Sequence, residues 1–273
     1  MTGDKAVLRW IVDEASYLAS GFRRVDAANR DRMLACLDFL HSLPCFRAYK
    51  ERSFDLLSAA EAGSVVDIAC GQGDDVIRLK QRFGRAVGVD ASHELIEEAR
   101  KRHREHGCEF VLADAAQLPF GDGEFSAARV DRSLQHMEAP DRVVREMARV
   151  VRSGGSLVCA EPDWGTFFLS APMSKMTREI QERFAQSFRN PWIGRNLPSL
   201  LKGYVERVQV EAYTLLTTDF TASDNVFDVC NTVRLLQEEK KVELSGWIEE
   251  FREFGAVAGV TLVLCSGTTR RTI

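Results

Sequence analysis

Three aspartates each close a short apolar run in the first half of this chain, and their repetition points to one ligand site. Asp67 follows residues 64–66, Asp90 follows residues 86–89, and Asp114 follows residues 110–113. Short apolar runs separated by helical patterns predict parallel strands, whose carboxyl ends meet at one edge of a sheet, where open α/β folds bind ligands. We therefore expect the three carboxylates to surround a single small molecule.

The turn after Asp67 narrows the choice of ligand. Residues 67–73 read Asp-Ile-Ala-Cys-Gly-Gln-Gly, and Asp74 and Asp75 then begin a helical pattern. Glycines let a ligand approach the backbone, and the free amides of a helix start point toward it. A dinucleotide site needs the third glycine of G-x-G-x-x-G, which is missing here, and two acids would repel a pyrophosphate. The carboxylate at the strand end suits a cationic amine instead.

This turn resembles motif I of the class I S-adenosylmethionine (SAM) methyltransferases, D-x-G-x-G-x-G, with Ala69 in place of the first glycine. Asp90 lies about 20 residues after Gly71, like the acid that accepts both hydroxyls of an adenosine ribose. The segment 114–120 resembles the part of the family that contacts adenine. From Val65 to about Asp163, the chain is similar to the ubiquinone/menaquinone-biosynthesis-like group of small-molecule methyltransferases.

The resemblance implies SAM as cofactor and S-adenosylhomocysteine as product. The residues expected to bind this cofactor lie at or after the ends of the first four strands, and they are Asp67, Ala69, Gly71, Gly73, Asp90, Ala91, Asp114, Ala115, Asp131 and Arg132.

The expected fold is α/β: a Rossmann-like, doubly wound sheet of seven strands, mostly parallel with an antiparallel edge strand. The later strands are predicted at 125–131, 156–161, 205–217 and 256–265. Helical patterns at about 221–237 and 242–254 separate the last two strands, where the family usually has a short connection. We expect a helical lid over residues 1–60, built from helices at about 6–20, 25–41 and 46–57, and a SAM-binding domain over 61–273. An insert at about 164–200 is expected to cover the substrate pocket.

The acceptor pocket is expected between the lid and the segment that follows the fifth strand. Trp164 would supply a flat apolar wall, and Asp163 or Arg195 would orient a polar group of the acceptor. From the lid, Tyr17, Arg47 and Tyr49 are further candidates. The alternative is that Trp164 anchors the core, that Asp163 and Arg195 form a structural ion pair, and that the lid residues only pack.

His136 is the candidate general base, because it should emerge near the end of the fourth strand and can titrate near neutrality. Methyl transfer needs a base only when the acceptor must lose a proton. The alternative is a histidine at a helix start that is bonded to the backbone.

Composition excludes several other classes of protein. Hydrophobic residues make up 45% of the chain and charged residues 28%, as in ordinary globular proteins, and a net charge of −4 without a basic stripe argues against nucleic-acid binding. Seven cysteines without a C-x-x-C pair argue against disulfides or zinc, and His103, His106 and Cys108 fit a solvated helix end better than a metal site. We expect no metal, no export signal, no membrane segment and a cytoplasmic location; no sequence feature indicates an oligomeric state.

The leading hypothesis is a SAM-dependent methyltransferase that acts on a small, partly apolar molecule, at oxygen or carbon rather than nitrogen. Asn190-Pro191-Trp192 resembles the N-P-P-Y motif of nucleobase methyltransferases, but it does not follow the fourth strand, where that motif belongs. Two alternatives stay open: a nucleic-acid or protein methyltransferase, and a protein that binds SAM without methyl transfer, as a cyclase or a sensor.

Overall fold

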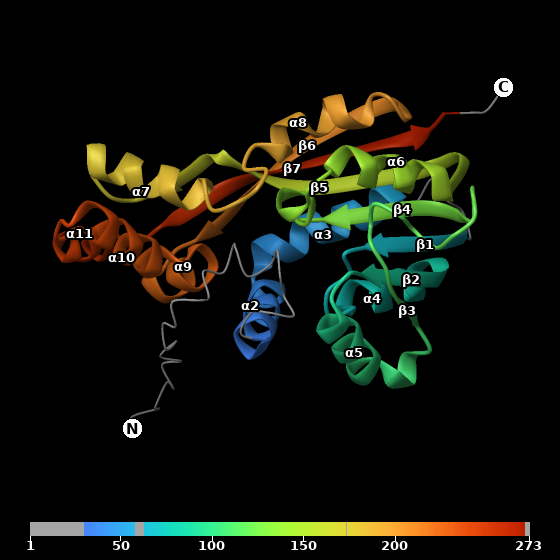
Figure 1. Cartoon of the computed structure of the whole chain (residues 1–273), viewed down its shortest axis with the longest axis horizontal. Helices are drawn as coiled ribbons and strands as arrows, with labels where there is room; N and C mark the ends of the chain where they lie inside the picture. Colours follow the sequence, from blue (N-terminus) through green and yellow to red (C-terminus); the bar gives the residue numbers. More distant parts are fainter. Residues whose placement is uncertain (1–29, 58–62, 173, 271–273) are drawn as a thin grey trace.

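The computed structural model describes residues 30–57, 63–172 and 174–270, which form one twisted sheet with helices on both faces (Figure 1). The expected helix at 6–20 lies outside the described residues. The helices are α2 (Arg30–Ser42), α3 (Pro44–Leu56), α4 (Asp74–Phe83), α5 (His93–Arg102), α6 (Pro140–Val150), α7 (Lys175–Ala185), α8 (Ile193–Leu201), α9 (Phe220–Phe227), α10 (Val229–Lys240) and α11 (Ser245–Glu253), with single 3₁₀ turns η3 (Arg104–His106) and η4 (Leu134–His136). The strands are β1 (Gly63–Ile68), β2 (Gly84–Asp90), β3 (Glu109–Leu112), β4 (Phe125–Asp131), β5 (Val151–Leu169), β6 (Val205–Thr217) and β7 (Ala258–Thr269).

The seven strands pair in the order β3-β2-β1-β4-β5-β7-β6. The first five are mutually parallel, whereas β7 runs antiparallel to both β5 and the edge strand β6. The predicted fold class, a mostly parallel doubly wound sheet with antiparallel pairing at one edge, is therefore confirmed. Because β2 and β3 are added on one side of β1 and β4 and β5 on the other, the crevice at the carboxyl ends of β1 and β4 is the expected ligand site.

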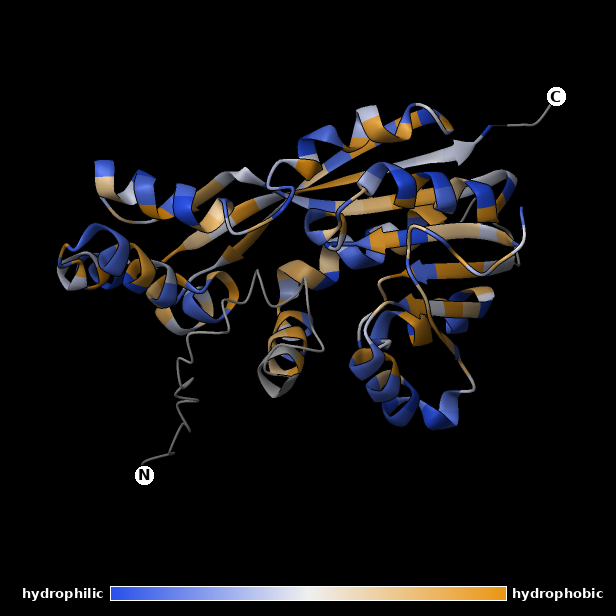
Figure 2. Ribbon diagram, in the orientation of Figure 1, coloured by the Kyte–Doolittle hydropathy of each residue, from blue (hydrophilic) through white to orange (hydrophobic). Residues whose placement is uncertain are grey.

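Apolar side chains form one core on each face of the sheet. Val76, Leu79 and Phe83 share one face of α4 through their i, i+3, i+7 spacing, and they belong to the core that also includes α3 and α5. On the opposite face, α6 and α8 bury Met147 and Leu197 against the strands. Figure 2 shows the same division, with apolar residues concentrated on the strands and polar residues on the outer sides of the helices.

β5 is much longer than the predicted strand at 156–161, and this changes the region beyond it. It continues through Pro162 and Trp164 to Leu169, pairs with β7, and shifts register between Asp163 and Phe168. Figure 1 shows β5, β6 and β7 extending beyond the parallel part of the sheet, where α7, α9, α10 and α11 gather around their ends. The long strands therefore carry a second group of helices next to the ligand-binding edge.

The predicted helix at 221–237 is two helices. They are interrupted at Asp228, whose backbone adopts a left-handed conformation with φ of 49°, which ends α9 before α10 begins. The expected insert is also divided, because α8 packs on the sheet through Ile193, Leu197 and Leu201 instead of covering a pocket.

Candidate active site

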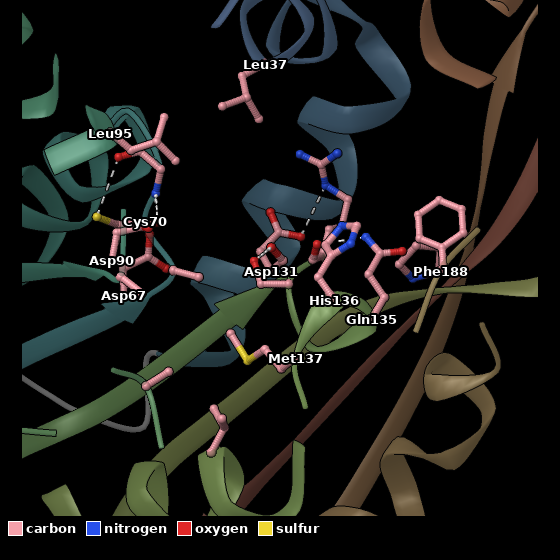
Figure 3. Close-up of a pocket in the computed structure, with 18 of the residues that line it drawn as sticks. Leu37, Asp67, Cys70, Asp90, Leu95, Asp131, Gln135, His136, Met137 and Phe188 are labelled. Carbon is pink, nitrogen blue, oxygen red and sulfur yellow. Dashed lines mark hydrogen bonds and ion pairs between the residues drawn. The ribbon is translucent and has the colours of Figure 1, made fainter. Parts of the chain in front are cut away.

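A cavity of about 970 Å³ opens at the carboxyl ends of β1, β2 and β4 and beside Pro162 and Trp164 of β5, and most of the predicted site residues line it. From the predicted cofactor set, the lining residues are Asp67, Ala69, Gly71, Asp90, Ala91, Asp114, Ala115, Asp131 and Arg132; His136 and Trp164 also line it. Figure 3 shows Asp67, Cys70 and Asp90 at one end of this cavity, Asp131 in the middle, and Gln135, His136 and Phe188 at the other end.

The turn between β1 and α4 presents its backbone to the cavity. Ala69, Gly71 and Gly73 all have positive φ, at 55°, 56° and 82°. Ala69 thus adopts the conformation that the first glycine of the motif would adopt more easily, at a steric cost. Gly73 does not line the cavity: it caps α4, and a Cβ atom there would lie 2.5 Å from the ring of Phe110. Its expected cofactor role is therefore corrected to one in packing the turn against β3.

Asp90 fixes this turn as well as facing the cavity. Its Oδ2 accepts a hydrogen bond from the Gly71 amide at 3.0 Å, and its Oδ1 accepts one from the Ser92 amide at 2.9 Å. Ser92 then caps α5, because its hydroxyl accepts a hydrogen bond from the Leu95 amide. A carboxylate oxygen can accept more than one hydrogen bond, so Asp90 can accept ligand hydroxyl groups beside these amide bonds.

Asp114 lies beyond the end of β3, which finishes at Leu112 and not at Asp114 as predicted. The carboxylate accepts a hydrogen bond from the Ala116 amide at 2.8 Å and is exposed. This local turn directs the Asp114–Ala116 segment along the cavity rim, next to Asp90.

A buried group of charged residues lies below the cavity, between α3, α4 and the ends of β1 and β4. Lys50 pairs with Asp75 and, at 3.1 Å, with Asp131. The Arg129 guanidinium contacts Asp67 at 2.9 Å, Asp75 at 3.2 Å and Asp131 at 2.8 Å. Neither this lysine nor this arginine was singled out from the sequence, although both hold carboxylates that line the cavity.

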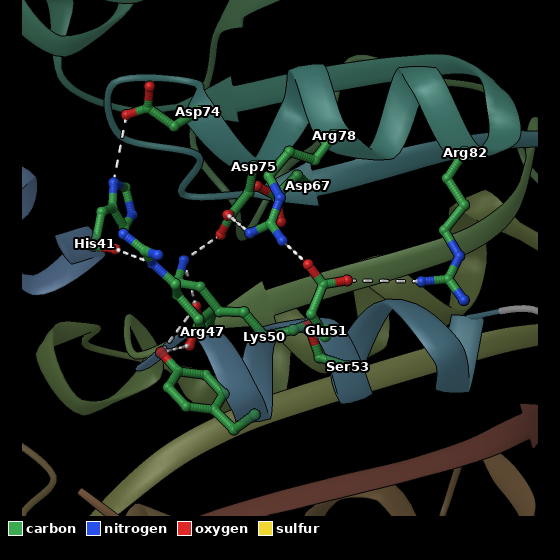
Figure 4. Close-up of polar contacts among 12 residues, drawn as sticks. His41, Arg47, Lys50, Glu51, Ser53, Asp67, Asp74, Asp75, Arg78 and Arg82 are labelled. Carbon is green, nitrogen blue, oxygen red and sulfur yellow. Dashed lines mark hydrogen bonds and ion pairs between the residues drawn. The ribbon is translucent and has the colours of Figure 1, made fainter. Parts of the chain in front are cut away.

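Burial and ion pairing have opposite effects on the pKa values of these carboxylates. Burial raises the pKa of Asp67 to about 6, against the opposing effect of Arg129. For Asp131 and Asp75, Lys50 and Arg129 overcome the effect of burial and hold the pKa below its usual range. Figure 4 shows the neighbouring pairs of α3 and α4, in which Glu51 contacts Arg78 at the more exposed end of the same interface.

The segment after β4 is held by a buried carboxyl group that the sequence did not reveal as functional. Glu161 of β5 is fully buried and accepts hydrogen bonds from the amides of Ser133, Leu134 and Gln135, at 2.7, 2.6 and 3.3 Å. Burial raises its pKa to about 8, although these amide bonds favour the charged form. The short turn η4 and His136 are thus fixed from below.

His136 lies at the end of η4, with its ring centroid 5.6 Å from that of Phe188. Its backbone amide bonds to the Ser133 carbonyl. The structure therefore places His136 on the cavity wall next to an apolar surface; its role as a base stays a prediction.

Aromatic side chains form the far wall of the cavity. Trp164 stacks on Phe188 with 4.3 Å between ring centroids, and Phe184 and Phe227 meet its edges. The indole N–H donates to Gln135 Oε1 at 2.6 Å. Trp164 is both a core residue and part of the cavity wall, so the two interpretations that the sequence left open, a core anchor and a pocket wall, are compatible.

Asp163 and Arg195 do not reach the cavity. Arg195 Nε lies 2.6 Å from Asp163 Oδ2, and both are absent from the lining. Side chains alternate along a strand, so Trp164 faces the cavity while Asp163, one residue earlier in β5, faces α8. Their expected contact with the acceptor is therefore corrected to the structural ion pair.

The lid candidates fall in three different places. Tyr17 lies outside the described residues. Tyr49 is fully buried beneath the cavity and donates a hydrogen bond to Asp131, and Arg47 lines a separate, smaller cavity between α2, α3 and α4. The lid residues that do line the main cavity include Leu37, Leu40 and Phe46.

Asn190, which was singled out from the sequence only for its resemblance to the N-P-P-Y motif, supports the segment after β4. Its side-chain amide donates to the Leu134 and Met137 carbonyls at 2.9 and 2.7 Å, and its backbone amide donates to Gln135. It therefore braces the segment that carries His136, together with Glu161.

The cavity residues fit SAM. Asp90 suits a ribose, and the carboxylate of Asp67 suits the amino group of the methionine part. Gln72 is almost fully buried on the cavity wall, with Nε2 donating to the Leu34 carbonyl, and its Oε1 has no hydrogen-bond partner among the described residues. A buried acceptor without a partner is costly, so a donor supplied by a bound ligand would satisfy it.

Comparison with known proteins agrees with this geometry. The profile described as a methyltransferase domain matches residues 66–159, from β1 into β5. An uncharacterized 37.1 kDa protein in transposon TN4556 of Streptomyces fradiae is 33% identical over 235 residues, which cover 83% of this chain and 68% of that protein. The ubiquinone/menaquinone biosynthesis C-methyltransferase UbiE of Desulfotalea psychrophila is 35% identical over 102 residues, which cover 37% of this chain and 42% of UbiE.

The solved structure of the YcgJ protein from Bacillus subtilis has the same fold, with a TM-score of 0.58 at 18% identity, over 81% of this chain and all of that one. The chain belongs to the class I SAM-dependent methyltransferases, in the group that includes UbiE. The match to UbiE spans less than half of that enzyme's length.

The described part of the chain contains neither a group of metal-binding side chains nor a helix that could cross a membrane. In residues 30–57, 63–172 and 174–270, no three His, Cys, Asp or Glu side chains are grouped to hold a metal ion. Among the helices of these same segments, none is long and apolar enough to cross a membrane.

Proposed function

We propose that this enzyme binds SAM along the ends of β3, β2 and β1 and transfers its methyl group to a small molecule in the aromatic half of the cavity, at oxygen or carbon. One observation carries the proposal: a single cavity joins the acids Asp114, Asp90 and Asp67 to the wall formed by Trp164 and Phe188. A cofactor and an acceptor can therefore lie side by side in one cavity.

In this proposal, each cofactor residue has a role that follows from its chemistry. Asp90 accepts the two ribose hydroxyls, and Asp114 with the Ala115 backbone receives the adenine edge. Asp67 faces the cationic amino group, and Gln72 Oε1 accepts a hydrogen bond from it. Gly71 lines the cavity with a φ of 56°, a conformation that suits glycine, and its lack of a side chain permits close approach of the cofactor.

Bound SAM supplies a methyl group that is already activated by the positively charged sulfur. The protein must hold the acceptor in line with that methyl group and exclude water, and such positioning can supply about 7–11 kcal/mol. Leu37 and Leu40 of α2 and Phe46 of α3 close one side of the cavity, which supports a lid role for residues 1–60. Of the insert at 164–200, Trp164, Phe184 and Phe188 form the acceptor wall.

His136 is proposed as the base for acceptors that must lose a proton. It lies on the cavity wall beside Phe188, and η4 is fixed by Glu161 and Asn190. An acceptor that must lose a proton from carbon or oxygen would therefore lie near the imidazole when it is placed against the aromatic wall.

The test is a transfer assay with SAM labelled in its methyl group and an extract of small metabolites as acceptors. We expect label in a product of low molecular mass, and no label when Asp90 is replaced by alanine. Label in protein or nucleic acid would contradict the small-molecule acceptor. Binding of SAM without any transfer to the extract would favour a protein that uses SAM without methyl transfer.

A further inference from the structure

The sheet order arranges the cavity residues in a row. The ends of β3, β2, β1 and β4 follow one another, carrying or preceding Asp114, Asp90, Asp67 and Arg132, and Trp164 comes next in this row, within β5. If the cofactor extends from Asp114 to Asp67, as proposed, its reactive end points toward β4. Arg132 then lies between the transferable methyl group and the aromatic wall.

The backbone of Arg132 is built into an unusual conformation. Its φ is 54°, which a side chain other than glycine rarely adopts. The amide donates to the Ala160 carbonyl at 2.7 Å, and the carbonyl accepts from Gln135 Nε2 at 2.8 Å. Strain of this kind is retained where the surroundings determine the position of a side chain.

The guanidinium of Arg132 has a defined position, but not all of its donors form hydrogen bonds. It lies over the ring of Phe46, with 4.8 Å between Cζ and the ring centroid. Its Nε is 3.6 Å from Asp131 Oδ1, too far for a hydrogen bond, and this buried atom has no hydrogen-bond partner among the described residues. A planar cation on the cavity wall therefore retains donors for a ligand.

The carboxylates closest to Arg132 already pair with other cations. Asp67, Asp75 and Asp131 are shared by Lys50 and Arg129, and Arg132 lies beside Asp131 without a hydrogen bond from its Nε. The Nε donor of Arg132 can therefore bind an anionic group of an acceptor.

We propose that the acceptor is a flat apolar molecule carrying an anionic oxygen, such as a carboxylate, and that Arg132 binds this oxygen while the ring system lies against Trp164 and Phe188. The inference rests on the proposed function and names its substrate class. It also moves Arg132 from the cofactor residues, where the sequence placed it, to the acceptor residues.

The experiment compares two probes that differ only in charge, 2-naphthoate and 2-naphthamide, by calorimetry on protein saturated with S-adenosylhomocysteine. We expect the naphthoate to bind at least tenfold more tightly, because hydrogen bonds to charged groups are the stronger ones. Arg132→Gln should reduce this ratio to within about twofold, and Arg132→Lys should keep part of it. Arg189→Gln is the matched control, because Arg189 also lines the cavity but is exposed and paired with exposed Glu138.

Three results would overturn the proposal. The first is equal affinity of the native protein for both probes, or no binding of either. The second is an unchanged ratio in Arg132→Gln. The third is a loss of S-adenosylhomocysteine affinity in Arg132→Gln with the ratio preserved, which would return Arg132 to the cofactor site. Failure of the native protein to bind S-adenosylhomocysteine at all would instead contradict the proposed function itself.

Discussion

The Asp90 carboxylate accepts a hydrogen bond from the Gly71 amide, with 3.0 Å between Oδ2 and N. Asp90 ends β2 and Gly71 belongs to the turn after β1, so one side chain ties together the two segments expected to bind the ribose and the methionine part of SAM. Asp90, which is proposed to bind the ribose, therefore also fixes the conformation of the turn at Gly71.

Replacing Asp90 by alanine should weaken SAM binding by about 100-fold or more. Two hydrogen bonds from ribose hydroxyls to a charged acceptor contribute about 1.5–3 kcal/mol each, and the Gly71 turn loses its anchor as well. Calorimetric titration with SAM measures the effect, with Asp122→Ala as control, since Asp122 is an exposed acid paired with Arg149. SAM affinity equal to that of the parent would show that Asp90 is only a strand-end acid.

Replacing Lys50 by methionine should cost about 3–5 kcal/mol of unfolding free energy. Lys50 is buried between two carboxylates, and removing it leaves Asp75 and Asp131 short of positive charge. Arg82→Met is the matched control, because Arg82 joins the same two helices through the exposed Asp55 and should cost about 0–1 kcal/mol. Urea denaturation gives both values, and equal costs for the two variants would refute the importance of burial here.

SAM affinity should fall as the pH is lowered through about 6. Burial raises the pKa of Asp67 to about 6, so this carboxylate becomes neutral below that pH and loses its attraction for the amino group of SAM. Because its folded pKa is raised, Asp67 favours folding below its unfolded pKa and loses that contribution as the pH rises through 6. Stability and SAM affinity should thus change in opposite directions over this window.

Titrations with SAM at pH 5, 6 and 7 measure this dependence. Asp67→Asn should bind weakly at all three values and show little change among them. A native affinity that does not vary between pH 5 and 7 would mean that Asp67 stays charged or does not contact the cofactor.

Replacing Trp164 by phenylalanine should raise the KM for the acceptor several-fold and leave SAM affinity within about twofold. Phenylalanine keeps an aromatic ring at this position, but the hydrogen bond from the indole to Gln135 is lost and the wall next to Phe188 changes shape. Steady-state kinetics with the acceptor found in the transfer assay separates the two constants. If SAM affinity and thermal stability fall together while acceptor KM is constant, Trp164 serves only the core.

Removing residues 1–43 should reduce turnover more than SAM affinity. The deletion takes away Leu37, Leu40 and His41, which line the cavity from α2, and so admits water to it. A second deletion of residues 1–29 retains α2, and the difference between the two proteins reports on this helix. Native turnover without residues 1–43 would contradict a lid.

The parallel part of the fold could be predicted because each of its elements carries a local signal. The apolar runs that end in Asp67 and Asp90, the cap at Ser92, and the pattern over 125–131 all depend on neighbouring residues. The cofactor half of the site followed from these strands, since parallel strands must bring their carboxyl ends to one edge.

The second half of β5 could not be predicted as well, because the expected strand ended at Glu161. Proline lacks an amide proton, yet Pro162 pairs with Leu262 inside the sheet. With the strand continued, alternation assigns Trp164 to the cavity and Asp163 to the opposite face. A strand that ended at Glu161 gave no basis for this distinction.

The buried charges depended on contacts far apart in the sequence. Lys50 resembles any surface lysine of an amphipathic helix, and nothing local connects it with Asp131. Arg129 did carry a usable signal, because a charge within an otherwise apolar strand must find a partner when the strand is buried. That signal indicated a buried carboxylate nearby without identifying which one.

The measurement that tests the central claim most directly is a pair of calorimetric titrations of the native protein, one with SAM and one with NAD. The arrangement of Asp67, Gly71 and Asp90 predicts one SAM molecule bound per chain, displaced by S-adenosylhomocysteine, and no measurable binding of NAD. Tight binding of NAD without binding of SAM would contradict the assignment of this cavity to SAM.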